Sequence, residues 1–206
     1  KLVNQPINHV VILTTDNLIK FVTLIDGVDV NLENGFVDNQ YPNQDYINDP
    51  LSGAPKYKSV EFKSGLNHLD KTNITEFVRS RKGSDLVSNG GTDLARIQRQ
   101  QLLIEAILNK VKTQNVINNK INFIDLYQFW DREIIKDFSD IDVLNLISVL
   151  SKNINKLSLN KITLPQLTNS QDGVYYHPTT FINKQWVFIP SDKEYKSFQK
   201  YISDSI

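Results

Sequence analysis

The spacing of apolar residues changes along the chain and predicts strands that alternate with helices. A short apolar run at His9–Leu13 predicts a buried strand, and Val28–Leu32 alternates between apolar and polar residues as a second strand would. Between them, apolar residues at helical spacing predict a helix over Asp16–Asp26, with Thr15 as its N-cap. This alternation indicates an α/β layered fold.

The second half of the chain has mostly helical periodicity. Its strongest helix extends from Asp93 to about Val111, with Thr92 as the N-cap. A last helix is expected to open at Ser191, with Glu194 completing a capping box. The other elements expected here are a helix at Phe123–Phe138, a helix at Ile141–Ile154 that Ser139 caps, and a short strand at Trp186–Ile189.

The middle of the chain has less regular patterns. Glu33–Lys58 contains three prolines and predicts a long loop, which is either functional or a surface excursion. A short strand is expected at Ser59–Phe62 and an extended segment at Val78–Arg81. A polar loop at Lys82–Gly91 then leads into the long helix.

The long helix carries polar residues on its apolar side near its N-terminus. Asp93, Arg96 and Gln100 fall on the apolar face or its edge at about 100° per residue. A buried polar group without a partner costs about 1–3 kcal/mol, so three together indicate a polar pocket. A helix N-terminus favours anions, and Arg99 falls on the opposite side, where we expect it to be solvated. The apolar face is formed by Leu94, Ile97, Ile104, Ile107, Leu108 and Val111.

Two arginines precede this helix with one residue between them. If their segment is extended, Arg79 and Arg81 point the same way. Guanidinium groups bind phosphate oxygens through paired hydrogen bonds, so these two arginines with Arg96 and Gln100 would form a clamp for a diphosphate. The residues alone leave two simpler interpretations open: a solvated Arg-x-Arg edge, and an ion pair between Asp93 and Arg96.

Composition narrows the function classes. The 206 residues include 23 basic and 23 acidic ones, so the net charge is +0 and no long basic track for nucleic acid is expected. The absence of cysteine excludes disulfides, thiolate metal sites and cysteine nucleophiles. The three histidines do not have the spacing of a zinc site. No apolar run is long enough to cross a membrane.

Several segments, in a fixed order, resemble the signature of the LytR-CpsA-Psr family. They are the turn at Phe62–Asp70, the arginine pair within Phe77–Arg81 and the helix start at Asp93–Gln101. Leu24–Val30 upstream and Gln185–Pro190 downstream resemble further family segments, so the resemblance extends over nearly the whole chain. Lys71 replaces the usual glycine of the turn, and Gly27 stands alone where the family often has two glycines.

The resemblance implies a central mixed β-sheet flanked by helices, in a single domain over residues 1–206 with a core at 7–112 and a helical and strand extension at 113–206. It implies a bacterial, membrane-anchored enzyme at the extracytoplasmic face of the cell membrane. Such an enzyme transfers a cell-wall glycopolymer, such as teichoic acid or polysaccharide, from a polyprenyl (undecaprenyl) pyrophosphate carrier to peptidoglycan. Arg79, Arg81, Arg96 and Gln100 would be its catalytic and pyrophosphate-binding residues, and Asp93 would join them in substrate binding.

The resemblance also implies parts that these residues do not include. Family members carry a membrane helix, early strands of the same sheet, a further arginine and the aspartates that hold Mg²⁺ ahead of the region matched here. We therefore expect a Mg²⁺ cofactor without a metal ligand in this chain, and a sheet that is incomplete at its N-terminal side. Two other functions stay open: a non-catalytic module that binds polyprenyl phosphate or envelope glycan, and a transcription regulator, against which the neutral charge argues.

Overall fold

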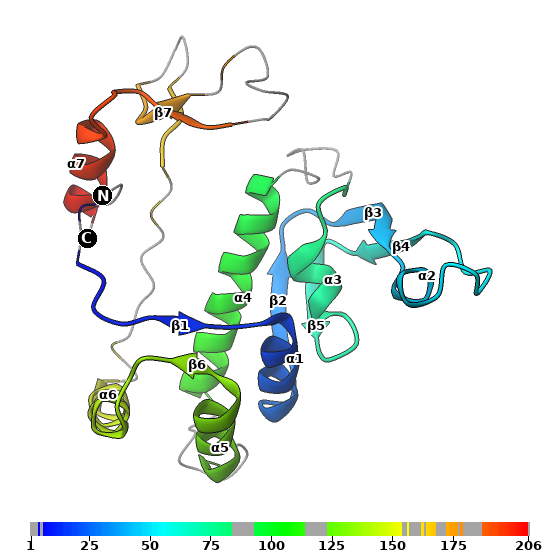
Figure 1. Cartoon of the computed structure of the whole chain (residues 1–206), viewed down its shortest axis with the longest axis horizontal. Coiled ribbons are helices and arrows are strands. Elements are labelled where there is room, and N and C mark those ends of the chain that lie inside the picture. Colours follow the sequence, from blue (N-terminus) through cyan, green and yellow to red (C-terminus); the bar gives the residue numbers. More distant parts are fainter. Residues whose placement is uncertain are drawn as a thin grey trace. The chain divides into compact units, whose positions relative to one another are not determined.

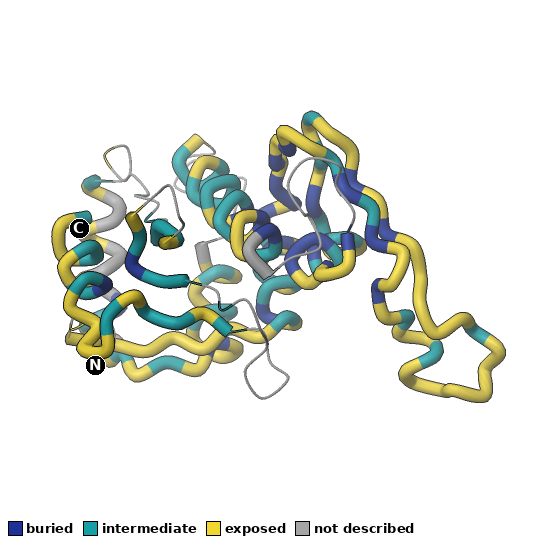
Figure 2. The backbone as a smooth tube through the Cα atoms, turned by 90° about the horizontal axis from the view of Figure 1, so that it is seen from above, coloured by how far each residue is buried: buried dark blue, intermediate teal, exposed yellow. Residues whose placement is uncertain are grey.

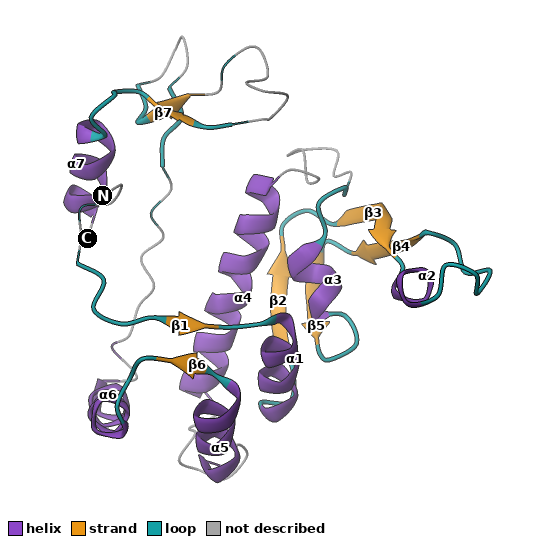
Figure 3. Cartoon of the chain, in the orientation of Figure 1, coloured by secondary structure: helices purple, strands orange, loops and turns teal. Residues whose placement is uncertain are grey.

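The computed structural model describes residues 4, 6–83, 93–113, 123–153, 156, 162, 164–167, 172–176, 178 and 187–205. They fall into two compact units. The larger unit is Val10–Lys156, and the smaller unit combines Lys1–His9 with Leu157–Ile206. Helices and short antiparallel strands make up both units, which confirms the α/β class (Figures 1 and 3). None of the described helices is both long and apolar enough to cross a bilayer.

The first helix of the larger unit, α1 (Thr15–Leu24), is held at both ends. Thr14, one residue before the expected cap, accepts a hydrogen bond from the Asn17 amide at 3.1 Å, and the Asn17 side chain accepts one from the Thr14 amide at 2.9 Å. At the other end Asp26 and Gly27 have φ values of 58° and 68°. This left-handed pair ends the helix and turns the chain into the first long strand.

Residues 28–69 form two antiparallel strand pairs that follow one another, and we call this segment the ribbon. β2 (Val28–Leu32) pairs with β5 (Gly65–Leu69), from Val28 opposite Leu69 to Leu32 opposite Gly65. β3 (Phe36–Pro42) pairs with β4 (Tyr57–Phe62) farther along. The expectation of a loop over Glu33–Lys58 is therefore wrong, because β3, the short helix α2 (Gln44–Asn48) and the start of β4 lie within it.

The core of the larger unit forms where the ribbon meets α3 (Ile74–Arg79) and α4 (Asp93–Thr113). Figure 2 shows the buried positions gathered there, whereas the end of the ribbon around α2 is exposed. Phe36 and Phe62 stack with ring centroids 5.2 Å apart, and Phe77 from α3 meets Phe62 edge-on at 5.2 Å. These rings fix α3 against the ribbon just before the arginine pair.

The buried face of α4 differs from the expected one. Leu103 is 4% exposed and belongs to the core, and Ala95 is also buried, whereas Ile104 is 54% exposed and Ile97 is also exposed. Apolar residues lie on two sides of this helix, and the side that packs is the one that meets α3 and β2. The buried face is therefore rotated about the helix axis by part of a turn from the expected one, and this places Arg99 on the buried side.

The rest of the larger unit is helical apart from one short strand pair. α5 (Phe123–Glu133) is shorter than expected, and α6 (Asp140–Asn153) follows with Ser139 capping it as expected through the Asp142 amide at 3.2 Å. Between the helices, β6 (Ile135–Lys136) pairs antiparallel with β1 (Val11–Ile12). β1 lies within the strand expected at His9–Leu13, but the expected burial is wrong, because Val11 and Ile12 are exposed.

The smaller unit contains one strand pair and one helix among its described residues. β7 (Tyr175–Tyr176) pairs with β8 (Ile189–Pro190), and α7 (Lys196–Ser205) follows. Asp192, not Ser191, caps this helix: its carboxylate accepts from the Lys196 and Ser197 amides at 2.8 Å each. The expected capping box is therefore wrong, and Trp186 of the expected strand lies outside the described residues.

Candidate functional site

The arginine pair lies where α3 ends, not on an extended segment. Arg79 is the last residue of the helix, Ser80 is its C-cap, and Arg81 follows. The buried face of α3 is apolar, and Ser80 continues this inward side of the chain, being 1% exposed. Arg79 and Arg81, on either side of Ser80, are both exposed. The expectation of an extended segment at Val78–Arg81 is therefore wrong, because α3 extends to Arg79.

A buried carboxylate of β3 accepts hydrogen bonds from the residues that follow α3. Asp38 is 1% exposed, and its Oδ2 accepts hydrogen bonds from the Ser80 hydroxyl and from the backbone amides of Arg81 and Lys82, both at 3.2 Å. Its Oδ1 accepts from the Gln40 amide at 2.9 Å. Four donors of this chain therefore satisfy one carboxylate. Sequence reasoning missed this residue, although Asp38 occupies an inward position in the alternation of β3.

The hydrogen bonds keep Asp38 ionised. Burial by itself raises the pKa of a carboxyl group, because it removes water from the charged form. The Ser80 hydroxyl and the amides of Gln40, Lys82 and Arg81 outweigh that effect, so the pKa of Asp38 lies below its ordinary value of 3.8. The carboxylate is therefore a fixed negative charge beneath the arginine pair.

Arg99 of α4 binds the same segment from the other side. Its Nε donates to the Phe77 carbonyl at 3.0 Å, its Nη2 donates to the Ser80 carbonyl, and its guanidinium lies 4.4 Å from the Phe36 ring centroid. The side chain is 5% exposed, so the expectation of a solvated Arg99 is wrong. The carbonyls at the end of α3 lack partners within the helix, and a buried guanidinium satisfies two of them.

Gln100 joins the start of α4 to the arginine segment. Its Nε2 donates to the carbonyl of Val78 at 3.2 Å, one residue before Arg79. Arg96 is half-buried and lies one turn earlier, so it shares this side of α4. The structure therefore brings Gln100 next to the segment of the arginine pair. Asp93 begins α4, but its side chain and the preceding residues 84–92 lie outside the described part.

The charges around Arg79 continue onto the ribbon. Burial raises the pKa of Tyr41, the negative charge of Glu76 adds to the increase, and the positive charge of Arg79 opposes it. Glu76 itself pairs with Lys58, with Nζ and Oε1 2.7 Å apart. Arg79 is therefore close enough to Tyr41 to act on it electrostatically.

A model of the LytR_cpsA_psr family matches residues 1–200 of the chain. The chain belongs to the LytR-CpsA-Psr family. The match covers the end of α3 and the whole of α4.

Several solved structures have a similar fold. A protein described as a transcriptional regulator from Enterococcus faecalis is 16% identical with a TM-score of 0.62, over 99% of this chain and 61% of its own. Bacillus subtilis TagV is 17% identical with a TM-score of 0.58, over 99% and 66%. A LytR-Csp2A-Psr enzyme from Actinomyces oris is 14% identical with a TM-score of 0.55, over 96% and 64%. No curated protein matches this chain.

These similarities concern the fold, because the sequence identities are low. The chain spans less than two thirds of the length of each of these three solved proteins. The part of the fold that this chain covers includes the end of α3 with the arginine pair, and α4.

The described residues do not fit a metal site. No group of three or more histidine, aspartate or glutamate side chains among them could hold a metal ion. Asp38, the buried carboxylate nearest to the arginine pair, already accepts four hydrogen bonds from this chain.

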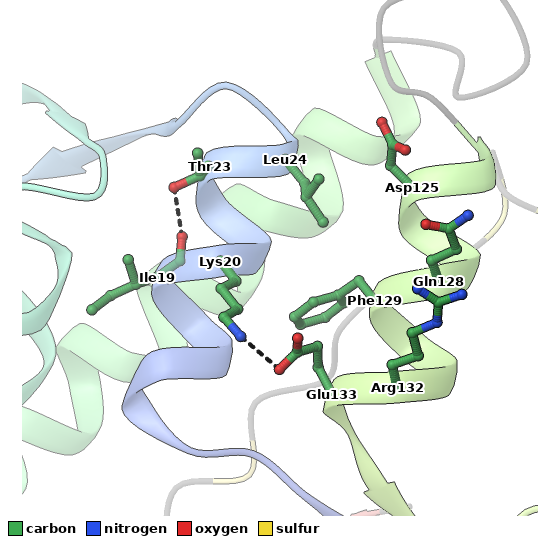
Figure 4. A pocket seen from close by; sticks show the side chains of 9 residues that line it. All are labelled: Ile19, Lys20, Thr23, Leu24, Asp125, Gln128, Phe129, Arg132 and Glu133. Atoms are coloured by element: carbon green, nitrogen blue, oxygen red, sulfur yellow. Dashed lines mark hydrogen bonds and ion pairs between the residues drawn. The ribbon is translucent and has the colours of Figure 1, made fainter.

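A groove between α1 and α5 is separate from the arginine segment (Figure 4). Its volume is ≈ 460 Å³, and Phe129 lies between its two helices. Lys20 on one side and Glu133 on the other form an ion pair of 2.7 Å, and Arg132 lies at the α5 side. None of the site residues expected from the sequence lines this groove.

Proposed function

We propose that the chain is the pyrophosphate-binding part of a cell-wall glycopolymer transferase. Such an enzyme binds a polymer linked to a polyprenyl (undecaprenyl) pyrophosphate and transfers it to peptidoglycan at the extracytoplasmic face of the membrane. Membership of the LytR-CpsA-Psr family supports the reaction class. The observation that supports the proposal is the hydrogen bond from Gln100 of α4 to the carbonyl of Val78, one residue before the exposed Arg79. Arg96 lies one turn before Gln100 on the same helix.

The chemistry suits these residue types. Guanidinium groups bind phosphate oxygens in pairs and stay charged, so Arg79, Arg81 and Arg96 would neutralise the pyrophosphate without a proton transfer. The amide of Gln100 would add an uncharged donor. An acceptor hydroxyl of peptidoglycan would attack the phosphorus that carries the polymer, and the bond to the second phosphate would break. The leaving polyprenyl phosphate gains negative charge, which the arginines stabilise.

Calorimetric titration of geranylgeranyl pyrophosphate into the protein tests the binding step. We expect the Arg79→Ala/Arg96→Ala variant to bind at least about 100-fold more weakly, because charge-assisted hydrogen bonds contribute about 1.5–3 kcal/mol each and two arginines are removed. Arg132→Ala, which removes an exposed arginine of α5, is the matched control and should leave the affinity unchanged. Equal affinity of wild type and double variant would remove these arginines from the site.

A transfer assay decides between an enzyme and a binding module. The protein is incubated with a polyprenyl pyrophosphate-linked polymer, peptidoglycan and Mg²⁺, and the polymer attached to peptidoglycan is measured. Transfer that Arg96→Ala reduces about 100-fold or more would support the transferase. Binding without any transfer would instead support a module that holds the carrier, the second function left open by the sequence.

A further inference from the structure

One peptide bond between the two arginines is held from both sides by buried charged groups. The Ser80 carbonyl accepts a hydrogen bond from Arg99 Nη2 of α4, and the Arg81 amide of the same peptide donates to Asp38 Oδ2 of β3 at 3.2 Å. Residues 38 and 99 come from elements far apart in the sequence. Their hydrogen bonds fix the orientation of the peptide plane, which the helix α3 alone does not do.

The side chain of Ser80 completes this arrangement. Its hydroxyl donates a hydrogen bond to the same Asp38 oxygen, and the Asp38 side chain has almost no contact with water. Ser80 is buried, whereas Arg79 and Arg81 on either side of it are both exposed. The Lys82 amide, which also donates to Asp38 at 3.2 Å, holds the chain beyond the pair.

The arrangement is a costly way to obtain stability alone. Asp38 is 1% exposed and Arg99 is 5% exposed, and removing two charged groups from water costs several kcal/mol that well-packed apolar residues would avoid. Buried charged groups of this kind can be retained because they specify one arrangement of the chain. Here the arrangement that they specify is the direction of the arginine pair.

We infer that Asp38 is a positioning residue, which acts with Ser80 and Arg99 to direct Arg79 and Arg81 toward the pyrophosphate. The inference rests on the proposed function for the ligand, and on the geometry for the positioning. Asp38 does not touch the ligand itself, since its oxygens face the backbone of this chain.

Asp38→Asn separates positioning from simple electrostatics, because the two effects have opposite signs. A negative charge close to an anion site opposes anion binding, so its removal alone would strengthen the binding of pyrophosphate. Positioning requires the reverse. An asparagine side chain offers one neutral acceptor oxygen in place of two charged ones. Even with that oxygen turned toward the Arg81 and Lys82 amides, their hydrogen bonds lose the carboxylate charge and weaken, and the Gln40 amide then faces an NH₂ group.

The experiment uses the whole chain, with inorganic pyrophosphate as the probe and two measurements. Calorimetry gives the affinity, and amide hydrogen exchange followed by NMR gives the protection of the Arg81 and Lys82 amides. We expect Asp38→Asn to weaken pyrophosphate binding about tenfold and to speed exchange of both amides about tenfold or more. Ser80→Ala keeps the backbone hydrogen bonds and should give a smaller change of the same sign.

Asp29→Asn is the matched control. Asp29 is an exposed carboxylate of β2 that pairs with His68 Nδ1 at 2.7 Å, so this variant also removes one negative charge from the ribbon. It should leave both amides unchanged and should not weaken the binding. A double-mutant cycle of Asp38→Asn with Arg81→Ala gives the second readout, because a residue that acts through Arg81 has less effect once Arg81 is absent.

The outcomes separate the inference from the proposed function. Unchanged exchange at Arg81 and Lys82 in Asp38→Asn, or tighter binding of pyrophosphate, would overturn the inference. Strictly additive losses in the double-mutant cycle would overturn it as well. If wild type does not bind pyrophosphate, the proposed function fails in this chain, and the exchange measurement still decides whether Asp38 holds the peptide. If Asp38→Asn does not fold, Ser80→Ala carries both measurements.

Discussion

Arg99 carries more of the local structure than its neighbours on α4. It is buried, and it satisfies the carbonyls of Phe77 and Ser80 while its guanidinium lies over the Phe36 ring. Arg99→Ala leaves two carbonyls without partners in a dry environment, so we expect the free energy of unfolding to fall by about 2–4 kcal/mol. Urea denaturation of both proteins measures this, with exposed Arg132→Ala expected to stay within about 0.5 kcal/mol of wild type. A similar small loss for both variants would contradict the role of Arg99.

The charge of Asp38 makes the free energy of unfolding depend on pH in the acidic range. Its pKa in the folded protein lies below 3.8, so the unfolded chain takes up a proton first as the pH falls. The stabilisation is therefore present above the unfolded pKa and is lost as the pH falls through the folded pKa. We expect the free energy of unfolding to decrease more for wild type than for Asp38→Asn between about pH 7 and about pH 3. Urea denaturation at both pH values tests this, and parallel decreases would show that Asp38 does not contribute.

At this scale the sequence identified residue types better than their surroundings. Arg79 and Arg81 could be selected because their spacing belongs to a family pattern, and both are exposed. Arg99 could not, because α4 has apolar residues on two sides and only contacts with distant elements decide which side is buried. Asp38 was missed for a related reason: a buried acid is recognisable only when its donors, here the Ser80 hydroxyl and three backbone amides, are known.

The link between α1 and β2 depends on a glycine in a left-handed conformation. Gly27 has φ +68°, and a Cβ there would lie 2.4 Å from His68 Nε2 and 2.9 Å from the Leu69 carbonyl oxygen. Gly53 has a similar φ of +78° with nothing within 4 Å of its Cβ position. Both changes to alanine should cost about 1–2 kcal/mol for the backbone, and Gly27→Ala should cost more because of the contacts.

Thermal or urea denaturation of the two alanine variants isolates that contact. We expect Gly27→Ala to be the less stable of the two, and His68→Ala in the Gly27→Ala background to recover part of the difference, because it removes the closest atoms. The Leu69 carbonyl would still be close, so the recovery should be incomplete. Equal stability of the two single variants would mean that the ribbon shifts to admit the methyl group.

Elements with strong local patterns were predicted, and those that depend on distant pairing were not. β2 was predicted with its observed bounds, and the helix expected from Asp93 is α4. In contrast, β3 pairs with β4 across α2 and a proline-rich stretch, so local signals of a loop dominated there. α3 was expected to be extended at Val78–Arg81, but its three buried residues pack on the ribbon and favour a helix.

The whole chain separates into two units, and the site lies within one of them. The core residues and every described site residue belong to Val10–Lys156. The α/β class could be predicted because strands and helices alternate in the sequence. The division into units could not be predicted, because the smaller unit joins Lys1–His9 to Leu157–Ile206, and no local pattern links segments so far apart.

A fragment of residues 10–156 should therefore fold and keep the properties of the arginine site. It contains the core cluster, both halves of the ribbon, and the hydrogen bonds of Asp38 and Arg99. We expect the NMR amide signals of Arg81 and Lys82 to have the same shifts in the fragment and in the whole chain. We also expect pyrophosphate affinity to agree within about threefold, since that corresponds to less than 1 kcal/mol. Arg79→Ala in the fragment is the control that should lower it. A folded fragment with altered Arg81 and Lys82 shifts would show that the smaller unit contributes to the site, whereas an unfolded fragment would show that the larger unit depends on it for stability.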